Sequence, residues 1–128
     1  MPDYKELRRF YFLQIDQNLC RCILSGLLIT NKKQFSLEHY VPCCRGDWDE
    51  THALVNVFPA YKIINNLKGR LLPCEWEMTK KKLMLKALDK NKLKHADRVI
   101  VEDALANMKN YIINPCDYCI NNIKCNQY

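Results

Sequence analysis

Two short segments of the chain contain residues that could carry out chemistry on a phosphodiester. The segment SLEHYVPCCRG places Glu38 beside His39, and LVNVFPAYKIINNLKGRLLP contains Asn56 in an apolar run, followed by Asn65 and Lys68. Phosphodiester cleavage needs a nucleophilic water, a base that deprotonates it, and positive charge beside the scissile phosphate. A histidine can be the base, and a divalent ion held by a few oxygen ligands can supply the charge. Alternatively, these residues form only a surface loop, a turn and a helix cap.

The residue types suggest a role for each position. Glu38 offers a carboxylate and Asn65 an amide oxygen, so both could bind the ion. Successive side chains of a strand point to opposite faces, so His39 would face the attacking water while Glu38 binds the metal ion. Asparagine is depleted in strands and costly in apolar surroundings unless it is hydrogen-bonded, so we expect Asn56 to brace the loop through bonds to the backbone. Lys68 lies one helical turn after Asn65 and could contact phosphate.

The elements before these residues are expected to be strands. Residues 8–16, RRFYFLQID, are rich in aromatic residues and predict a strand. The letters DQN then predict a turn, and LCRCILSGLLIT predicts a second strand over residues 19–30. We therefore expect an N-terminal β-hairpin within residues 1–35.

Residues 36–73 are expected to form the core that carries the candidate site. FSLEHYVP predicts a short strand that stops at Pro42, and the polar run CCRGDWDETHA predicts an exposed loop. LVNVF, which is short, β-branched and apolar, predicts the next strand. From Pro59 the sequence predicts a short helix that ends at Gly69.

Beyond Pro73 the apolar residues recur with helical spacing, which predicts two helices joined through DKNK. The two apolar stripes consist of Leu83, Met84, Ala87 and Leu88, and of Val101, Ala104, Leu105, Met108 and Ile112. The fold class that follows is α+β in one domain over residues 1–128, with N-terminal strands, a central core and a helical, cysteine-rich part at 74–128.

The charge of the chain favours a polyanionic partner. The formal net charge is +6, and many of the lysines lie in TKKKLMLKALDKNKLK. We expect Lys82 and Lys86 of this segment, together with Lys68 and Arg70, to contact the backbone of DNA or, alternatively, RNA. The other interpretation of the lysine segment is a solvated helix face.

The sequence also bears on the compartment. No apolar run approaches the roughly 18 residues of a membrane span. The first residues, MPDYKELRRFYF, contain acids and no small-residue cleavage site. We therefore expect a cytoplasmic protein that makes no membrane contact, and its oligomeric state is open.

Eight cysteines are many for a chain of 128 residues. Without a secretory signal, metal binding or reduced thiols are favoured over disulfides. PCDYCINNIKC places Cys116, Cys119 and Cys125 at ligand-like spacing, so they could hold a structural zinc ion. An iron–sulfur cluster or plain reduced thiols are the alternatives. The fourth zinc ligand could be Cys20, Cys22, Cys74 or His95.

The ordered set of Glu38-His39, Asn56 and Asn65 resembles the ββα-metal core of the HNH endonuclease family. LEHYVP is similar to the family's D-H-I-x-P opening, and NNLKG to its N-x-x-K-G helix end, which favours Asn65 over Asn66. The resemblance covers residues 36–73. It departs from the family in having Glu38 where Asp is usual. It also lacks the zinc knuckle of two C-x2-C pairs that many members carry.

The resemblance implies a metal-dependent endonuclease that hydrolyses phosphodiester bonds in DNA. His39 would be the general base, and Glu38 and Asn65 would hold Mg²⁺ or Mn²⁺. An alternative is a catalytically degenerate HNH-like module that binds nucleic acid or protein without cutting. A third is a cysteine-based metal or redox protein in which the likeness is accidental.

Overall fold

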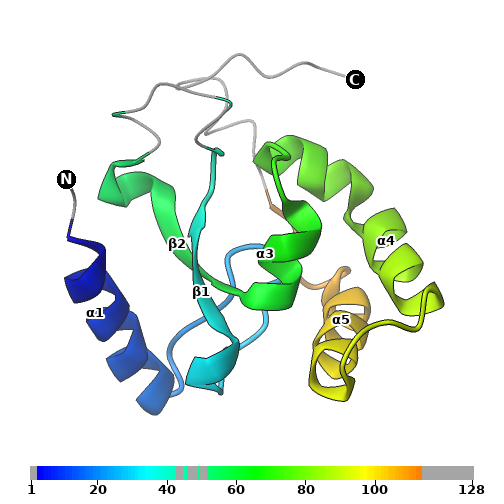
Figure 1. The fold of residues 1–128 in the computed structure, drawn as a ribbon, viewed down its shortest axis with the longest axis horizontal. Coiled ribbons are helices and arrows are strands. Elements are labelled where there is room, and N and C mark those ends of the chain that lie inside the picture. Colours follow the sequence, from blue (N-terminus) through cyan, green and yellow to red (C-terminus); the bar gives the residue numbers. More distant parts are fainter. Residues whose placement is uncertain (1–2, 43–44, 46–48, 50–51, 114–128) are drawn as a thin grey trace.

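The computed structural model describes residues 3–42, 45, 49 and 52–113 and has the expected α+β class. Helix α1 precedes the antiparallel strands β1 and β2, and three further helices follow. In Figure 1, α1 lies on one side of the β1–β2 pair and α3 on the other, with α4 and α5 beyond α3. The bounds are α1 Tyr4–Asp16, β1 Phe35–His39, β2 Val57–Tyr61, α3 Lys62–Lys68, α4 Pro73–Asp89 and α5 His95–Asn107.

The N-terminal segment is a helix, and the predicted strand over residues 8–16 is wrong. Asp3 caps this helix, because its Oδ1 accepts the backbone N–H of Glu6 at 3.1 Å. Tyr11 and Ile15, four residues apart, are among the residues of α1 that turn toward the core. The aromatic residues that suggested a strand instead serve helix packing: Phe12 meets Phe35 of β1 edge to face, at 5.4 Å between ring centroids.

The predicted second strand over residues 19–30 is also wrong, because the chain turns back on itself within that range. Only an isolated bridge pairs Arg21 with Leu28. Gly26 has φ of +75°, and a Cβ placed there would overlap the ring of Tyr111. Its N–H donates to the carbonyl of Cys22 at 2.8 Å. The predicted N-terminal β-hairpin is therefore replaced by α1 and a compact turn.

The two strands of the predicted core are present, with shifted boundaries. β1 pairs with β2 in a register that places Glu38 opposite Phe58 and His39 opposite Val57. Asn56 lies in a 3₁₀ turn, Leu54–Asn56, immediately before β2. The helix predicted from Pro59 begins three residues later, because Pro59 lies within β2. A two-stranded sheet has only edge strands, where proline is tolerated. Helix α3 ends at Gly69, as expected.

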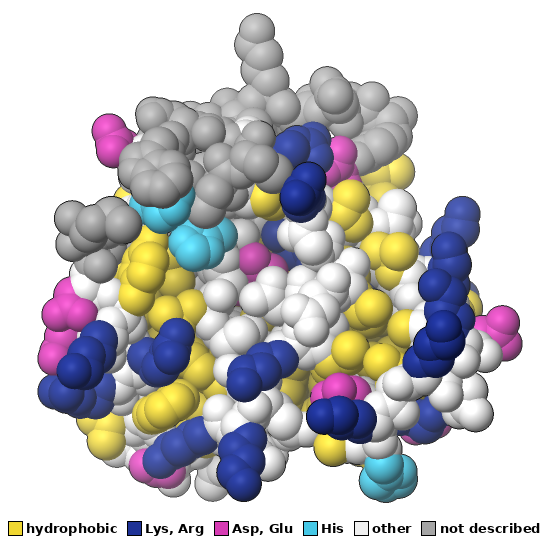
Figure 2. All heavy atoms as spheres, viewed as in Figure 1, with side chains coloured by type: hydrophobic (Ala, Val, Ile, Leu, Met, Phe, Trp, Pro, Cys, Tyr) yellow, Lys and Arg dark blue, Asp and Glu magenta, His cyan; other side chains and the backbone are white. Residues whose placement is uncertain are grey.

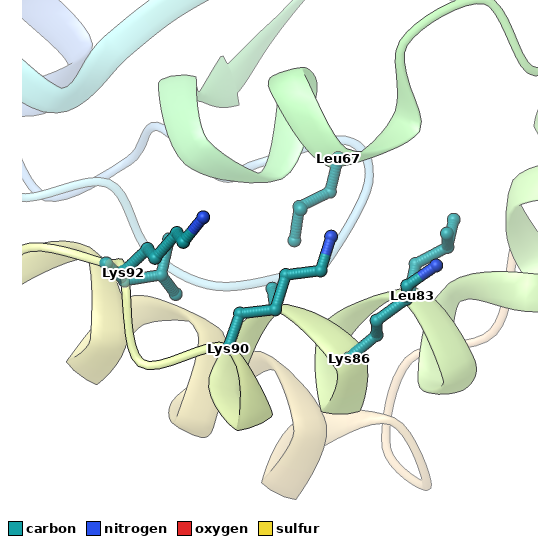
Figure 3. Close-up of a pocket in the computed structure, with 7 residues that line it drawn as sticks. Leu67, Leu83, Lys86, Lys90 and Lys92 are labelled. Carbon is teal, nitrogen blue, oxygen red and sulfur yellow. The ribbon is translucent and has the colours of Figure 1, made fainter.

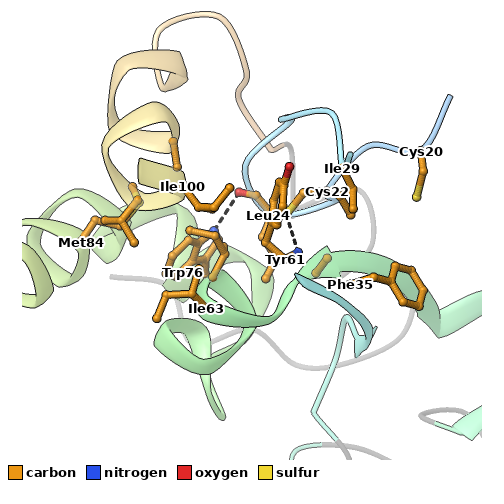
Figure 4. Close-up of a cluster of buried hydrophobic side chains, with 14 of the residues drawn as sticks. Cys20, Cys22, Leu24, Ile29, Phe35, Tyr61, Ile63, Trp76, Met84 and Ile100 are labelled. Atoms are coloured by element: carbon orange, nitrogen blue, oxygen red, sulfur yellow. Dashed lines mark hydrogen bonds between the residues drawn. The ribbon is translucent and has the colours of Figure 1, made fainter. Parts of the chain in front are cut away.

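The two C-terminal helices are confirmed, and they close the core over the 20–29 turn. Met84, Val101 and Ala104 of the predicted stripes are buried, whereas Ile112 lies beyond α5 and is exposed. The indole of Trp76 donates to the carbonyl of Leu24 at 3.1 Å, which joins α4 to the turn. Figure 4 shows this cluster, whose labelled members are Cys20, Cys22, Leu24, Ile29, Phe35, Tyr61, Ile63, Trp76, Met84 and Ile100.

The predicted loop, the membrane question and the suggested zinc ligands remain to be compared with the structure. The predicted loop at 43–53 falls mostly outside the described residues, as do Cys116, Cys119 and Cys125. Among the described residues, no helix combines the length and apolar composition that crossing a membrane requires. Of the other suggested zinc ligands, Cys20, Cys22 and Cys74 are buried. Burial raises the pKa of Cys20 to about 11, which disfavours the thiolate that zinc binds.

Candidate active site

Helix α3 packs on the face of β1 that carries Ser36 and Glu38. The side chain of Asn65 donates from Nδ2 to Oγ of Ser36 at 3.1 Å, and Oγ donates to the carbonyl of Ala60 at 3.1 Å. One turn further along α3, Nζ of Lys68 lies 3.6 Å from Oε2 of Glu38. The structure therefore directs both predicted metal ligands, Glu38 and Asn65, into the interface between β1 and α3.

Glu38 and Lys68 form a buried ion pair, with 4% and 1% of their surfaces exposed. Burial raises the pKa of Glu38 to about 7, and the nearby Lys68 ammonium opposes that rise. Lys68 was expected to contact nucleic acid, but its side chain points into the interior. The expectation failed because sequence spacing placed Lys68 on the face of Asn65 without showing that β1 covers this face.

Asn56 makes the backbone bonds expected of a bracing residue. It is fully buried, its Oδ1 accepts the N–H of Val41 at 2.9 Å, and its Nδ2 donates to the carbonyl of Val41 at 2.9 Å. Its own carbonyl accepts the N–H of Tyr40 at 2.8 Å. These bonds fix the two residues that follow His39, so the end of β1 is held against the start of β2.

His39 points to the opposite face from Glu38, as strand alternation predicts. Its Nε2 lies 3.3 Å from the hydroxyl of Tyr4, and the two rings meet edge to face at 5.7 Å. The ring of His52 lies 5.4 Å away on the same side. Burial lowers the pKa of His39, and the charges of His52 and Lys68 lower it further. The imidazole is therefore neutral at pH 7 and able to accept a proton.

Three residues of this site were missed from the sequence. Tyr4 could not be found because its helix was predicted as a strand. Ser36 could have been found, since it lies two residues before Glu38 and so shares its face. His52 carried a weaker signal, as one of three histidines in the chain and part of the segment between the two strands. Figure 2 shows histidine side chains beside each other at the upper left of the molecule.

The remaining predicted nucleic-acid contacts lie on the surface. Arg70, Lys82 and Lys86 are exposed. Lys86 also lines an open groove of about 300 Å³ between α3, α4 and the turn after α4, with Leu67 and Leu83 among its apolar walls. The ammonium ends of Lys86, Lys90 and Lys92 lie along this groove in Figure 3. Lysine and arginine side chains are also spread around the face shown in Figure 2.

The fit of a divalent ion depends on Glu38 and Asn65. The described residues contain no group of three or more His, Cys, Asp and Glu side chains that could hold a metal ion. Mg²⁺ keeps several waters and often takes only one or two protein oxygens. Oε2 of Glu38 is buried and makes no hydrogen bond within the described part of the chain. Because Nδ2 of Asn65 is engaged by Ser36, Oδ1 is its remaining ligand atom. A carboxylate oxygen and an amide oxygen are the kinds of ligand that a hard cation takes, and the Lys68 ammonium now lies 3.6 Å from Oε2 of Glu38.

No family model matches the chain, and neither a curated protein nor a solved structure matches it.

Proposed function

We propose that the chain is a metal-dependent endonuclease of the HNH type that hydrolyses phosphodiester bonds in DNA. The observation that supports this most is the buried carboxylate of Glu38 between β1 and α3. Its Oε2 makes no hydrogen bond within the described residues and has the Lys68 ammonium 3.6 Å away. The next residue, His39, carries an imidazole whose pKa is lowered. A candidate cation ligand and a neutral base thus occupy consecutive positions at the end of β1, on opposite faces of the strand.

Each side chain of the site has a distinct task in this proposal. Glu38 and Asn65 would hold Mg²⁺ or Mn²⁺, which when bound supplies positive charge to the scissile phosphate and the leaving oxygen. His39 takes the proton from the attacking water. Asn56 keeps His39 in place through its bonds to Val41. Lys68 pairs with the carboxylate of Glu38 in the structure, and its ammonium would give way to the ion.

Purified protein should convert supercoiled plasmid to nicked or linear DNA in Mg²⁺ or Mn²⁺, and excess EDTA should stop the reaction. The reason is that the neutral base alone offers no positive charge to the phosphate. Gel electrophoresis measures the conversion, and His39→Ala prepared in parallel controls for contaminating nucleases. Absence of nicking with every divalent ion tried would remove the endonuclease proposal.

A second candidate function is an HNH-like module that binds nucleic acid without cutting it. The ion pair between Glu38 and Lys68 favours this candidate, because an ammonium already neutralises the carboxylate. Binding alone would be supported if wild-type protein holds DNA on the filter in a filter-binding assay but does not nick that DNA in Mn²⁺. Nicking in Mn²⁺ would instead support the enzyme.

Reversing two charges on α4 should weaken DNA binding without changing the chemical step. In the variant Lys82→Glu with Lys86→Glu, affinity should fall similarly for all DNA sequences. The plot of log affinity against log salt should flatten by about one unit for each phosphate that the variant no longer neutralises. Fluorescence anisotropy at several salt concentrations measures both quantities.

The control for this variant is Lys5→Glu with Lys33→Glu, which changes the net charge equally at exposed positions outside α4. The rate at saturating DNA should stay near wild type in both variants. If the α4 variant has the affinity and salt slope of the control, the lysines of α4 form only a solvated face.

A further inference from the structure

The hydrogen bonds of the Tyr4 hydroxyl have a direction that the geometry determines. Tyr4 donates from Oη to the carbonyl of His52 at 2.8 Å. A phenol carries one proton, and a carbonyl oxygen can only accept. The hydroxyl proton of Tyr4 is therefore used in the hydrogen bond to the carbonyl of His52. The contact of 3.3 Å between Oη and Nε2 of His39 is then a hydrogen bond only if Nε2 carries the proton and donates it.

We infer that Tyr4 is a positioning residue that holds neutral His39 as the tautomer protonated on Nε2. The lone pair of the neutral ring then lies on Nδ1, which makes no hydrogen bond with any described residue. Nδ1 is consequently the atom that accepts a proton. The functional part of this inference rests on the proposed endonuclease activity, whereas the tautomer itself does not.

The surroundings of Tyr4 suit it to this role. Tyr4 is the first residue of α1, directly after the capping residue Asp3. Further along α1, Phe12 packs against Phe35 at the start of β1, so the helix is held along the strand that carries His39. The Tyr4 ring also contacts the His39 ring edge to face. Tyr4 thus joins α1, the end of β1 and the segment of His52.

The tautomer can be measured without any activity. In wild-type protein with ¹⁵N-labelled histidine, long-range ¹H–¹⁵N correlation NMR at mildly alkaline pH should show His39 protonated on Nε2. Tyr4→Phe keeps the ring contact but removes the oxygen, so the His39 nitrogen shifts should move toward a mixture of tautomers. The control Tyr11→Phe removes a hydroxyl from the same helix and should leave the His39 signals unchanged. A wild-type His39 protonated on Nδ1, or identical His39 signals in Tyr4→Phe, would overturn the inference.

Single-turnover cleavage tests the positioning role separately. Tyr4→Phe should cleave about tenfold more slowly at unchanged DNA affinity, the lower end of the loss found when the hydrogen-bond partner of a metal-ligating histidine is removed. A wild-type rate in Tyr4→Phe would refute the positioning role even if the tautomer is as expected. If wild-type protein does not cleave at all, the endonuclease proposal fails, while the NMR result still decides what Tyr4 does to His39.

Discussion

Replacing His39 by alanine should lower the rate of DNA cleavage by about 10²- to 10⁴-fold, the usual contribution of a general base. The protein should stay folded, because His39 is only half buried and lies at the end of β1. Binding should also persist, since the proposed phosphate contacts of Lys82 and Lys86 lie on another element. Single-turnover cleavage of a labelled duplex measures the rate, and anisotropy measures binding.

The matched control is His95→Ala, which removes an exposed histidine at the start of α5. It should cleave like wild type. If His39→Ala cleaves within about threefold of wild type, His39 is not the base, because a general base contributes far more than that.

The pH dependence of cleavage follows from the state of His39. The base must be neutral, and its pKa is lowered from the ordinary value of 6.5. The active form of His39 therefore accumulates as pH rises through that lowered pKa. Glu38 must also be ionised to hold the ion, and its pKa is raised to about 7. The wild-type rate should therefore keep rising through pH 7 and level off in mildly alkaline solution.

Replacing Asn56 by alanine should lower the free energy of unfolding by roughly 2–6 kcal/mol. The change removes two hydrogen bonds of 2.9 Å and leaves both backbone groups of Val41 without these partners inside the protein. Each buried group stranded in this way costs about 1–3 kcal/mol. Urea denaturation followed by circular dichroism measures the decrease.

Asn66→Ala is the control for this effect, because Asn66 is an exposed asparagine on α3. Its unfolding free energy should stay within about 0.5 kcal/mol of wild type. If Asn56→Ala is as stable as this control, the bonds to Val41 do not hold the end of β1 in solution.

The elements that could be predicted were those whose signals are local. Gly69 ended α3 as expected, and the apolar stripes around Met84 and Val101 predicted α4 and α5. The N-terminal helix was missed because the residues FYF have strand propensity. Tyr11 and Phe12 instead pack against Phe35, which is distant in sequence, and Phe10 stays exposed. Tertiary packing outweighed local propensity there.

In the candidate site, too, local sequence signals gave correct predictions and features that depend on tertiary packing did not. Alternation along a strand predicted that Glu38 and His39 face opposite sides, and their contacts with Lys68 and Tyr4 confirm it. The burial of Lys68 could not be predicted, since lysine is rarely buried unless it is paired and its partner lies thirty positions earlier. Tyr4 could not be predicted because its helix was not.

The claim on which the proposed activity depends is that Glu38 can take a divalent ion in place of the Lys68 ammonium. Titration with Mn²⁺, with the free ion followed by electron paramagnetic resonance, tests it directly. Mn²⁺ favours oxygen ligands, so the cysteines should not compete. The comparison is the double variant Glu38→Gln with Lys68→Met, which removes both buried charges together and so avoids leaving one unpaired. Wild type should bind Mn²⁺ at one site, and the double variant about tenfold or more weakly. Wild type that leaves all the Mn²⁺ free, or a double variant with wild-type affinity, would contradict the assignment.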